Sequence, residues 1–367
     1  MSDKIYLENW NGIFDLVEKH YAEKGLLTNN QMDASVVVLW QDVRSAPEHL
    51  ARLCRDTLGK PVVVMQHGRG ATRDYGPPNN FKLLADKIMV WGQSERLRLL
   101  KYGVEDHRIA VTGCPLIPRL LPRDKTRMGK NVLFVPVIAE QECPENLLVY
   151  SELKIWETKG LQRFLNENMV NLKKGWAIEN NMYKDVQLAD GTVERRLWST
   201  EVVPRLPRNI TYQHGLINCK LTGLHDAPQY MSPLLMTNQN DPQHIANLVE
   251  MLMNTDVVVC LEEGTLQLLA TALDIPVIVV DIFKYGTYGG MQDYDKVEKI
   301  KSPAAYWLKS LHNLQDTLDY ALAHPEARRQ ERIQTVEHEG GANLGDITKN
   351  VVNVIEGFRS AKRLLTA

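Results

Sequence analysis

The feature that most constrains the fold of this chain is a series of short, almost wholly apolar runs separated by longer segments with helical periodicity. The runs lie at residues 35–40, 61–65, 87–91, 108–112, 131–135, 256–260 and 276–280. They are too short for helices and lack apolar–polar alternation, so they are typical of parallel strands covered on both faces. The segments with helical character are 47–58, 94–102, 245–254 and 265–272. This alternation predicts a layered α/β architecture.

A stretch rich in proline, lysine and arginine, residues 115–130, interrupts the alternation. We interpret it as a linker between two α/β domains, one over residues 1–118 and one over residues 131–345. Apolar residues spaced for one helical face predict a final helix over residues 346–367. A chain of 367 residues is long enough to form two such domains.

Residues 172–218 form an irregular stretch that we interpret as an insertion into the second domain. It contains seven Lys and Arg residues against five Asp and Glu residues, with Trp176 and Trp198 among them. Asp190-Gly191 is typical of a two-residue turn, so we expect a β-hairpin there. The excess of positive charge is small, which leaves both a solvated loop and a nucleic-acid contact open.

Composition excludes several classes of protein. The net charge of −2 provides no global attraction to nucleic acid or to an anionic membrane. The five cysteines form no CxxC pair, which argues against a disulfide framework and against a zinc site. No apolar run approaches the roughly 20 residues of a membrane span, and the first residues lack a secretion-signal pattern. We therefore expect a cytoplasmic protein. The absence of GxxxxGK[ST], HExxH and GxSxG counts against P-loop NTPases, zincins and serine hydrolases.

The loop Gln66-His67-Gly68-Arg69-Gly70 follows one of the apolar runs. Ligands bind beyond the carboxyl ends of parallel strands, so His67 is a candidate general base for a hydroxyl group. Asp74 is a second candidate for that role, and Arg69 and Arg73 are candidate ligands for phosphate or another anion. An imidazole that only hydrogen-bonds the loop backbone remains an equal alternative for His67.

A second loop, around Gly264-Thr265, joins an apolar run to a predicted helix. The first amides of a helix have no internal partners and lie at its positive end, which suits a pyrophosphate. Glu262 and Glu263 are candidates for binding sugar or ribose hydroxyls, with a plain acidic strand–helix connection as the alternative. Weaker candidates for donor binding are Lys220 and His225, at the two ends of another short apolar segment.

The order of several motifs resembles that of the GT-B-fold glycosyltransferases and their relatives. Those relatives include the UDP-N-acetylglucosamine 2-epimerases and the glycerophosphate and capsule-polymer transferases. The resemblance rests on Gln66-His67-Gly68, Trp91-Gly92, residues 109–115, residues 131–136, residues 256–280 and residues 339–347. It implies two Rossmann-like parallel-sheet domains that face a cleft, with a C-terminal helix that crosses back onto the first domain.

In that family the second domain binds a nucleotide-sugar donor, the first domain binds most of the acceptor, and no metal or other cofactor is usually bound. The resemblance places His67 at the acceptor, and Glu263, Gly264 and Thr265 at the donor diphosphate. The Gln-Glu-Glu of the epimerases is here Gln267-Leu268-Leu269, so ribose recognition must differ.

The function expected from the sequence is metal-independent transfer of a sugar from a nucleotide-sugar co-substrate to a hydroxyl acceptor, assisted by a general base. One alternative is a DNA-modifying glycosyltransferase that acts on hydroxymethylated bases through the 172–218 insertion. Two further alternatives are a nucleotide-sugar 2-epimerase and a non-catalytic binder. The sequence assigns neither the donor nucleotide, the sugar, the acceptor, the stereochemistry nor the oligomeric state.

Overall fold

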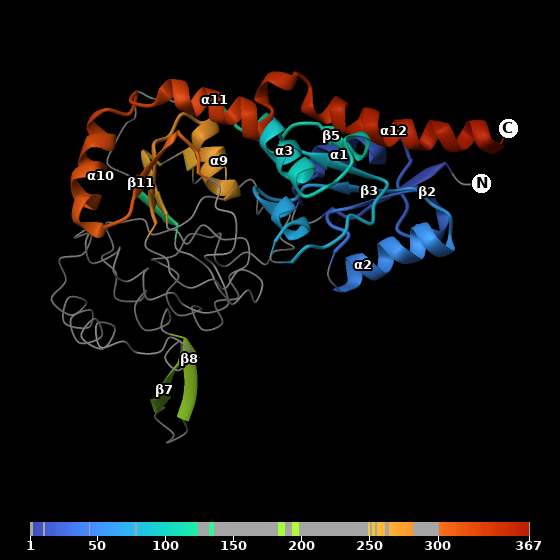
Figure 1. Cartoon of the computed structure of the whole chain (residues 1–367), viewed down its shortest axis with the longest axis horizontal. Coiled ribbons are helices and arrows are strands. Elements are labelled where there is room, and N and C mark those ends of the chain that lie inside the picture. The colour runs from blue at the N-terminus through green and yellow to red at the C-terminus, as the bar shows by residue number, and fades with distance from the viewer. Residues whose placement is uncertain are drawn as a thin grey trace. The chain divides into compact units, whose positions relative to one another are not determined.

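A computed structural model describes residues 3–9, 12–43, 45–77, 79–123, 132–135, 183–187, 193–197, 249, 252–253, 255–260, 264–281 and 301–366. The chain divides into two compact units (Figure 1). Unit 1 comprises Met1–Leu121, Lys296–Ile300 and Gln330–Ala367, and unit 2 comprises Pro122–Asp295 and Lys301–Arg329.

Unit 1 is built on a five-stranded sheet in the order β1-β2-β3-β4-β5, in which every neighbouring pair is parallel. The strands are β1 (Lys4–Leu7), β2 (Ala34–Leu39), β3 (Val62–Met65), β4 (Lys87–Val90) and β5 (Ile109–Val111). Every residue of β2 and β3 is buried. Their unbroken apolar sequence is therefore explained by cover on both faces.

Helices cover both faces of this sheet. Figure 1 shows α2 (Ser45–Arg52) and α12 (Ile347–Thr366) on opposite sides of it. On the α2 side, Ala51 packs into an apolar cluster with Val37 and Leu39, which also receives residues of α3 (Gln93–Lys101). On the other side, α1 (Asp15–Glu23) packs on α12, and Tyr21 donates a hydrogen bond to the carbonyl of Val352 at 3.4 Å.

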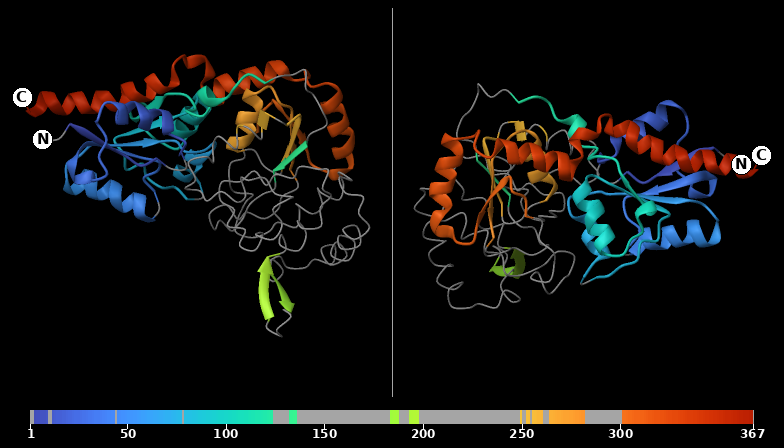
Figure 2. Two further views of the ribbon diagram at one scale, coloured as in Figure 1. Left: turned by 180° about the vertical axis from the view of Figure 1, so that it is seen from behind. Right: turned by 45° about the horizontal axis from the view of Figure 1, so that its top comes forward.

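The C-terminal segment belongs to unit 1. It consists of α11 (Arg329–Gly340), a short turn and α12. The end of α12 lies beside the N-terminal strand (Figure 2), where Arg359 donates a hydrogen bond to Asp3 at 2.9 Å. This arrangement confirms the predicted C-terminal helix that returns to the first sheet.

Glycines allow this segment to approach the carboxyl ends of β4 and β5. A Cβ atom on Gly92 would lie 2.3 Å from the carbonyl oxygen of His338. Gly341 has a φ of +65°, and a Cβ atom there would lie 2.5 Å from the carbonyl oxygen of Trp91. Between them, the Cys114 amide donates a hydrogen bond to the carbonyl of Gly340 at 2.8 Å. The backbones therefore meet at distances that only glycine permits.

Unit 2 contains a four-stranded parallel sheet in the order β11-β10-β9-β6. Its strands are β6 (Val132–Val135), β9 (Val257–Cys260), β10 (Val277–Val280) and β11 (Ala305–Leu308). Helix α9 (Thr265–Ala272) connects β9 to β10, and α10 (Leu314–Ala323) packs on the same two strands. Together the two sheets confirm the predicted pair of Rossmann-like parallel-sheet domains.

A separate antiparallel hairpin pairs β7 (Tyr183–Gln187) with β8 (Val193–Leu197), with Tyr183 opposite Leu197. This confirms the hairpin predicted across Asp190-Gly191, although the turn itself lies outside the described residues.

All seven apolar runs of the sequence are strands in the structure, and the helices expected near 47–58, 94–102, 265–272 and 346–367 are present as α2, α3, α9 and α12. Of the helix expected over 245–254, the structure describes residues 249 and 252–253, which are helical. The sequence analysis missed strands β1 and β11, because KIYL and AYWL mix apolar residues with a lysine or aromatic rings. It also missed α1, α10 and α11.

Within the described part of the chain, no helix is long and apolar enough to cross a bilayer.

The close approach at Gly341 leads to a test with a matched control. Gly341 and Gly25 share a φ of +65°, but nothing lies within 4 Å of a Cβ atom at Gly25. The free-energy cost of placing alanine in the left-handed backbone conformation is therefore the same at both positions. We expect Gly341→Ala to lower the free energy of unfolding by about 1–3 kcal/mol more than Gly25→Ala, because only the former creates a backbone clash. Chemical denaturation of the full-length variants measures this difference, and equal unfolding midpoints would contradict the described contact.

Candidate functional site at the carboxyl edge of the unit 1 sheet

The five strands of unit 1 are parallel, so their carboxyl ends meet at one edge of the sheet. Ligands of open α/β sheets bind beyond this edge. Glu8 follows β1, Trp40 follows β2, and Gln66-His67 follow β3. Trp91-Gly92 follow β4. The residues that the sequence analysis selected around His67 therefore lie at the expected end of the sheet.

The His67 ring is held by the neighbouring strand end. Its Nδ1 atom lies 2.9 Å from the backbone carbonyl oxygen of Trp40. The two rings also meet edge to face, with centroids 4.7 Å apart and planes at 89°. A carbonyl oxygen only accepts hydrogen bonds, so Nδ1 carries the proton and Nε2 carries the lone pair. The backbone hydrogen bond that the sequence analysis kept as an alternative is present, and it leaves Nε2 as the nitrogen that can accept a proton.

The half-buried position of the His67 ring changes the acidity of this histidine. Desolvation lowers the pKa of His67 to about 4, and the hydrogen bond to the Trp40 carbonyl opposes this shift. The imidazole is therefore neutral at pH 7. The position thus combines a fixed tautomer with an uncharged ring, the state in which an imidazole accepts a proton from a hydroxyl group.

Gln66 fixes the strand end that carries His67. Its side-chain oxygen accepts a hydrogen bond from the Trp91 amide at 2.8 Å, and its side-chain nitrogen donates to the carbonyl of Gly68 at 2.8 Å. The Trp91 indole in turn donates to the Gln66 carbonyl at 2.9 Å. Gln66 is 3% exposed, so these bonds lie in a buried, rigid frame.

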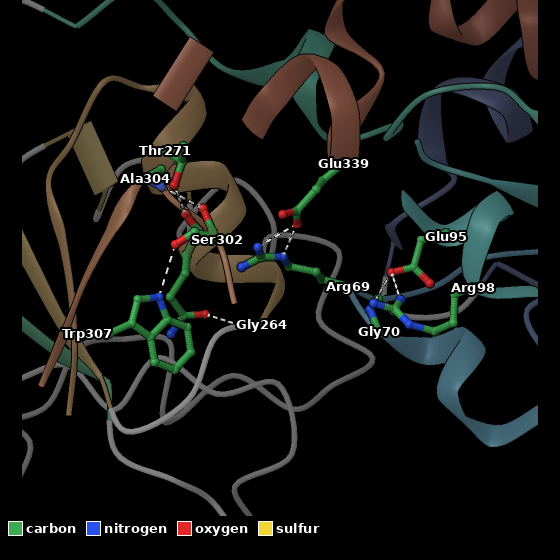
Figure 3. Close-up of polar contacts among 12 residues, drawn as sticks. Arg69, Gly70, Glu95, Arg98, Gly264, Thr271, Ser302, Ala304, Trp307 and Glu339 are labelled. Atoms are coloured by element: carbon green, nitrogen blue, oxygen red, sulfur yellow. Dashed lines mark hydrogen bonds and ion pairs between the residues drawn. The ribbon is translucent and has the colours of Figure 1, made fainter. Parts of the chain in front are cut away.

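The loop after His67 is anchored by a buried carboxylate on α3 (Figure 3). Glu95 accepts hydrogen bonds from the Gly70 amide at 3.3 Å and from the Thr72 hydroxyl. It also pairs with Arg98 at 2.6 Å. Gly70 has a φ of +77°, which turns the chain into a 3-10 helix over Ala71–Tyr75. The loop is therefore held in place by a carboxylate of α3.

Arg69 forms a buried ion pair with Glu339 of the C-terminal segment, at 2.6 Å from its Nε atom (Figure 3). The Arg69 side chain is only 2% exposed. Arg73 donates to the carbonyl of Gly70 at 3.0 Å, and Asp74 accepts a hydrogen bond from Asn79 at 3.0 Å. Each of these three side chains therefore forms hydrogen bonds that stabilise the loop conformation. The anion-binding roles of Arg69 and Arg73, and the catalytic role of Asp74, stay predictions.

Asp42, which the sequence analysis did not select, ties β2 to a distant loop. Its carboxylate accepts hydrogen bonds from the Tyr75 hydroxyl at 2.7 Å and from the amides of Leu84 and Ala85 at 2.6 Å. Burial raises the pKa of Asp42 and of Tyr75. No sequence pattern marks such a residue, because its partners lie more than 30 positions away.

In unit 2, Gly264 and Thr265 begin α9 directly after the β9 loop, as expected. The Gly264 amide donates to the side-chain oxygen of Gln267 at 2.7 Å, a contact drawn in Figure 3. Gln267 is 3% exposed, so this helix start is partly capped by its own side chain. The other donor-binding candidates lie outside the described residues: Lys220, His225, Glu262 and Glu263. Among the residues that the structure describes, no group of three His, Cys, Asp or Glu side chains could hold a metal ion.

Comparison with known proteins supports the fold. No protein-family model and no curated protein matches the sequence. Among solved structures, the wall teichoic acid polymerase TagF overlaps 98% of this chain and 90% of its own, with a TM-score of 0.50 and 10% identity. A histidine-to-alanine variant of TagF overlaps with a TM-score of 0.54 and the same identity. A putative UDP-N-acetylglucosamine 2-epimerase from Listeria monocytogenes covers 94% of this chain and 78% of its own at 12% identity, with a TM-score of 0.45.

Identities this low establish the architecture alone. The chain has a GT-B-like fold, as its motif order predicted.

The lowered pKa of His67 predicts a dependence of stability on pH. An unfolded histidine binds its proton near pH 6.5, whereas the folded His67 binds one only near pH 4. Between these values the unfolded state holds the extra proton, so stability is lost as the pH falls from about 6.5 to about 4, by up to about 3 kcal/mol.

His67→Asn keeps a donor for the Trp40 carbonyl but removes the titration. Denaturation across this pH range should therefore show a shallower loss of stability in His67→Asn than in the unmodified protein. His107→Asn is the control, because the His107 side chain is 76% exposed. Parallel pH profiles for all three proteins would contradict the lowered pKa of His67.

Proposed function

We propose that this chain is a GT-B-type glycosyltransferase that moves a sugar from a nucleotide-sugar donor to a hydroxyl acceptor, by the metal-independent route that its motif resemblance implies. The observation that carries the proposal is the state of His67: neutral, with Nδ1 hydrogen-bonded to the Trp40 carbonyl and the lone pair on Nε2. The GT-B-like fold supports a transferase of this kind.

In the proposed reaction, the acceptor oxygen attacks the anomeric carbon of the donor sugar while its proton passes to Nε2 of His67. The bond from that carbon to the diphosphate breaks, and its electron pair leaves with the nucleoside diphosphate. The Trp40 carbonyl stabilises the imidazolium that forms, because Nδ1 continues to donate to it. The negative charge of the leaving group favours the same protonated state.

The donor would be held by unit 2. Helix α9 presents its positive end at Gly264-Thr265, where backbone amides and the helix dipole favour a diphosphate. Gln267 takes the Gly264 amide in the described structure, so the diphosphate would use the amides that follow it. A TagF variant soaked with CDPG overlaps this chain with a TM-score of 0.50, so CDP is one of the nucleotides to test. Sugar or nucleotide contacts from Lys220, His225, Glu262 and Glu263 complete the proposed donor subsite.

A DNA-modifying transferase is the second candidate, because the 172–218 insertion contains the β7–β8 hairpin, whose register pairs Lys184 with Arg196 and Asp185 with Arg195. Three basic residues at these paired positions give the hairpin a local excess of positive charge, which suits a phosphate backbone. Salt-sensitive binding of a duplex, abolished by deleting residues 183–197, supports this candidate, and no binding at low salt rejects it.

A nucleotide screen followed by a transfer assay tests the proposal. UDP, CDP, GDP or CMP should raise the melting temperature by mass action, and the stabilising nucleotide identifies the donor class. His67→Asn should keep that thermal shift, because the donor binds unit 2, but lower turnover by roughly 10²–10⁴-fold through loss of the base. His107→Asn serves as the control and should retain both properties.

Three other outcomes would contradict the proposal or part of it. Full turnover in His67→Asn would show that His67 is not the catalytic base. Turnover of a nucleotide sugar without any acceptor would favour 2-epimerisation. A folded protein that no nucleotide stabilises would favour the non-catalytic binder.

A further inference from the structure

We propose that Gln66 is a positioning residue for His67, and that only a neutral side chain with both an acceptor and a donor can fill this role. The inference rests on the proposed function for its catalytic meaning, because His67 is the base of that reaction. The two ends of the Gln66 amide have separate tasks, one in the sheet and one in the loop. The sequence analysis gave Gln66 no role of its own.

Gln66 changes the hydrogen-bond pattern at the point where β3 ends. Up to this residue the β3–β4 ladder is regular, with Met65 opposite Met89 and the Gln66 amide donating to the Met89 carbonyl at 2.9 Å. The next bond of a regular parallel ladder would join the Trp91 amide to the Gln66 carbonyl. In this structure the Trp91 amide donates instead to the Gln66 side-chain oxygen at 2.8 Å, and the Gln66 carbonyl accepts from the Trp91 indole at 2.9 Å. The side chains of these two residues therefore replace one ladder bond and end the strand immediately before His67.

The other end of the amide holds the chain beyond His67. The Gln66 side-chain nitrogen donates to the Gly68 carbonyl at 2.8 Å. The backbone carbonyls on either side of His67 are thus both fixed, the first by the Trp91 indole and the second by the Gln66 amide. His67 lies inside this closed loop, so the position of its Cα atom is set by the backbone. This placement brings Nδ1 to 2.9 Å from the Trp40 carbonyl oxygen and leaves Nε2 as the acceptor.

Only a group that both donates and accepts can satisfy the two partners of the Gln66 side chain. The Trp91 amide can only donate and the Gly68 carbonyl can only accept, so the oxygen and nitrogen of the side chain cannot be exchanged. Gln66 is 3% exposed and Trp91 is 2% exposed, so a lost bond leaves a buried polar group unpaired. A carboxylate at position 66 would face the Gly68 carbonyl with a second acceptor and repel it. A protonated carboxyl group would reproduce both bonds.

Two substitutions separate this role from simple packing. Gln66→Met keeps the length of the side chain but removes both of its hydrogen bonds. Gln66→Glu keeps the shape and responds to pH, because its carboxyl group donates and accepts when protonated but only accepts when ionised. Burial raises the pKa of such a carboxyl group, so the response should fall above the pKa of about 4 of His67. Gln334→Glu, at an exposed position of α11, is the matched control.

The first readout needs no substrate. Long-range ¹H–¹⁵N spectra of histidine-labelled protein report the tautomer of each imidazole, and the His67 signals are assigned by their loss in His67→Asn. Above the pKa of His67, we expect a single Nδ1-protonated state in the unmodified protein and in Gln334→Glu. Gln66→Met should show a mixed or exchange-broadened state throughout this pH range. Gln66→Glu should show that altered state at high pH and return to the unmodified state as the pH is lowered.

Two spectral results would overturn the positioning role. One is an unchanged His67 spectrum in a folded Gln66→Met protein, and the other is a Gln66→Glu spectrum that does not respond to pH. If Gln66→Met does not fold, Trp91→Phe carries the same expectation, because it removes the indole bond to the Gln66 carbonyl and leaves the backbone bonds in place.

The second readout is turnover, measured relative to the unmodified protein at each pH. Gln66→Met should lower kcat by about tenfold to a hundredfold, as expected for a misplaced catalytic group, with KM changed less than about twofold. The kcat of Gln66→Glu should fall to a similar extent at high pH and recover as the pH is lowered, and a loss that is the same at every pH would overturn the role. The proposed function fails separately, when His67→Asn itself retains turnover. If no transfer is found, the spectra alone decide the role of Gln66.

Discussion

The close approach of the C-terminal segment to the ends of β4 and β5 is the constraint on which unit 1 depends. At Gly92 and Gly341 the backbones of two distant parts of the chain meet with no room for a Cβ atom. The buried ion pair between Arg69 and Glu339 joins the same segment to the loop that follows His67. Because breaking one half of such a pair leaves an uncompensated charge, the segment is bound to this edge both sterically and electrostatically. The order of the His67 loop therefore depends on residues more than 250 positions away.

In the proposed reaction, one contact of His67 has both a structural and a chemical role. The hydrogen bond to the Trp40 carbonyl satisfies a partly buried donor at the end of a strand. The same bond decides which nitrogen carries the lone pair, and desolvation keeps the ring neutral. A weak base of this kind is useful where negative charge develops nearby during the reaction, since that charge favours the imidazolium. The two interpretations of this histidine that the sequence allowed are thus not exclusive.

Much of the fold could be predicted because burial on both faces of a parallel sheet leaves a direct trace in the chain. The valine-rich runs of β2, β3, β9 and β10 could be assigned from sequence alone. Strands β1 and β11 escaped because each mixes apolar residues with a lysine or aromatic rings, which weakens that trace. The positions of the candidate residues follow the same rule. His67 and Gly264 follow recognisable strands, whereas Asp42 carries no local pattern at all. The structural role of Asp42 comes from its partners Tyr75, Leu84 and Ala85, which the fold brings to it from distant parts of the chain.

The sequence by itself determined that this chain forms parallel α/β layers, that a histidine ends one of the strands, and that a glycine begins the helix after another. These properties are local, because strand burial and helix starts depend on residues within a few positions of one another. Only the tertiary structure decided that the Trp40 carbonyl fixes the tautomer of His67 and that Arg69 pairs with Glu339. The order of strands in a sheet and the return of a C-terminal helix bring together groups far apart in the chain, and their pKa values and hydrogen bonds follow from that proximity.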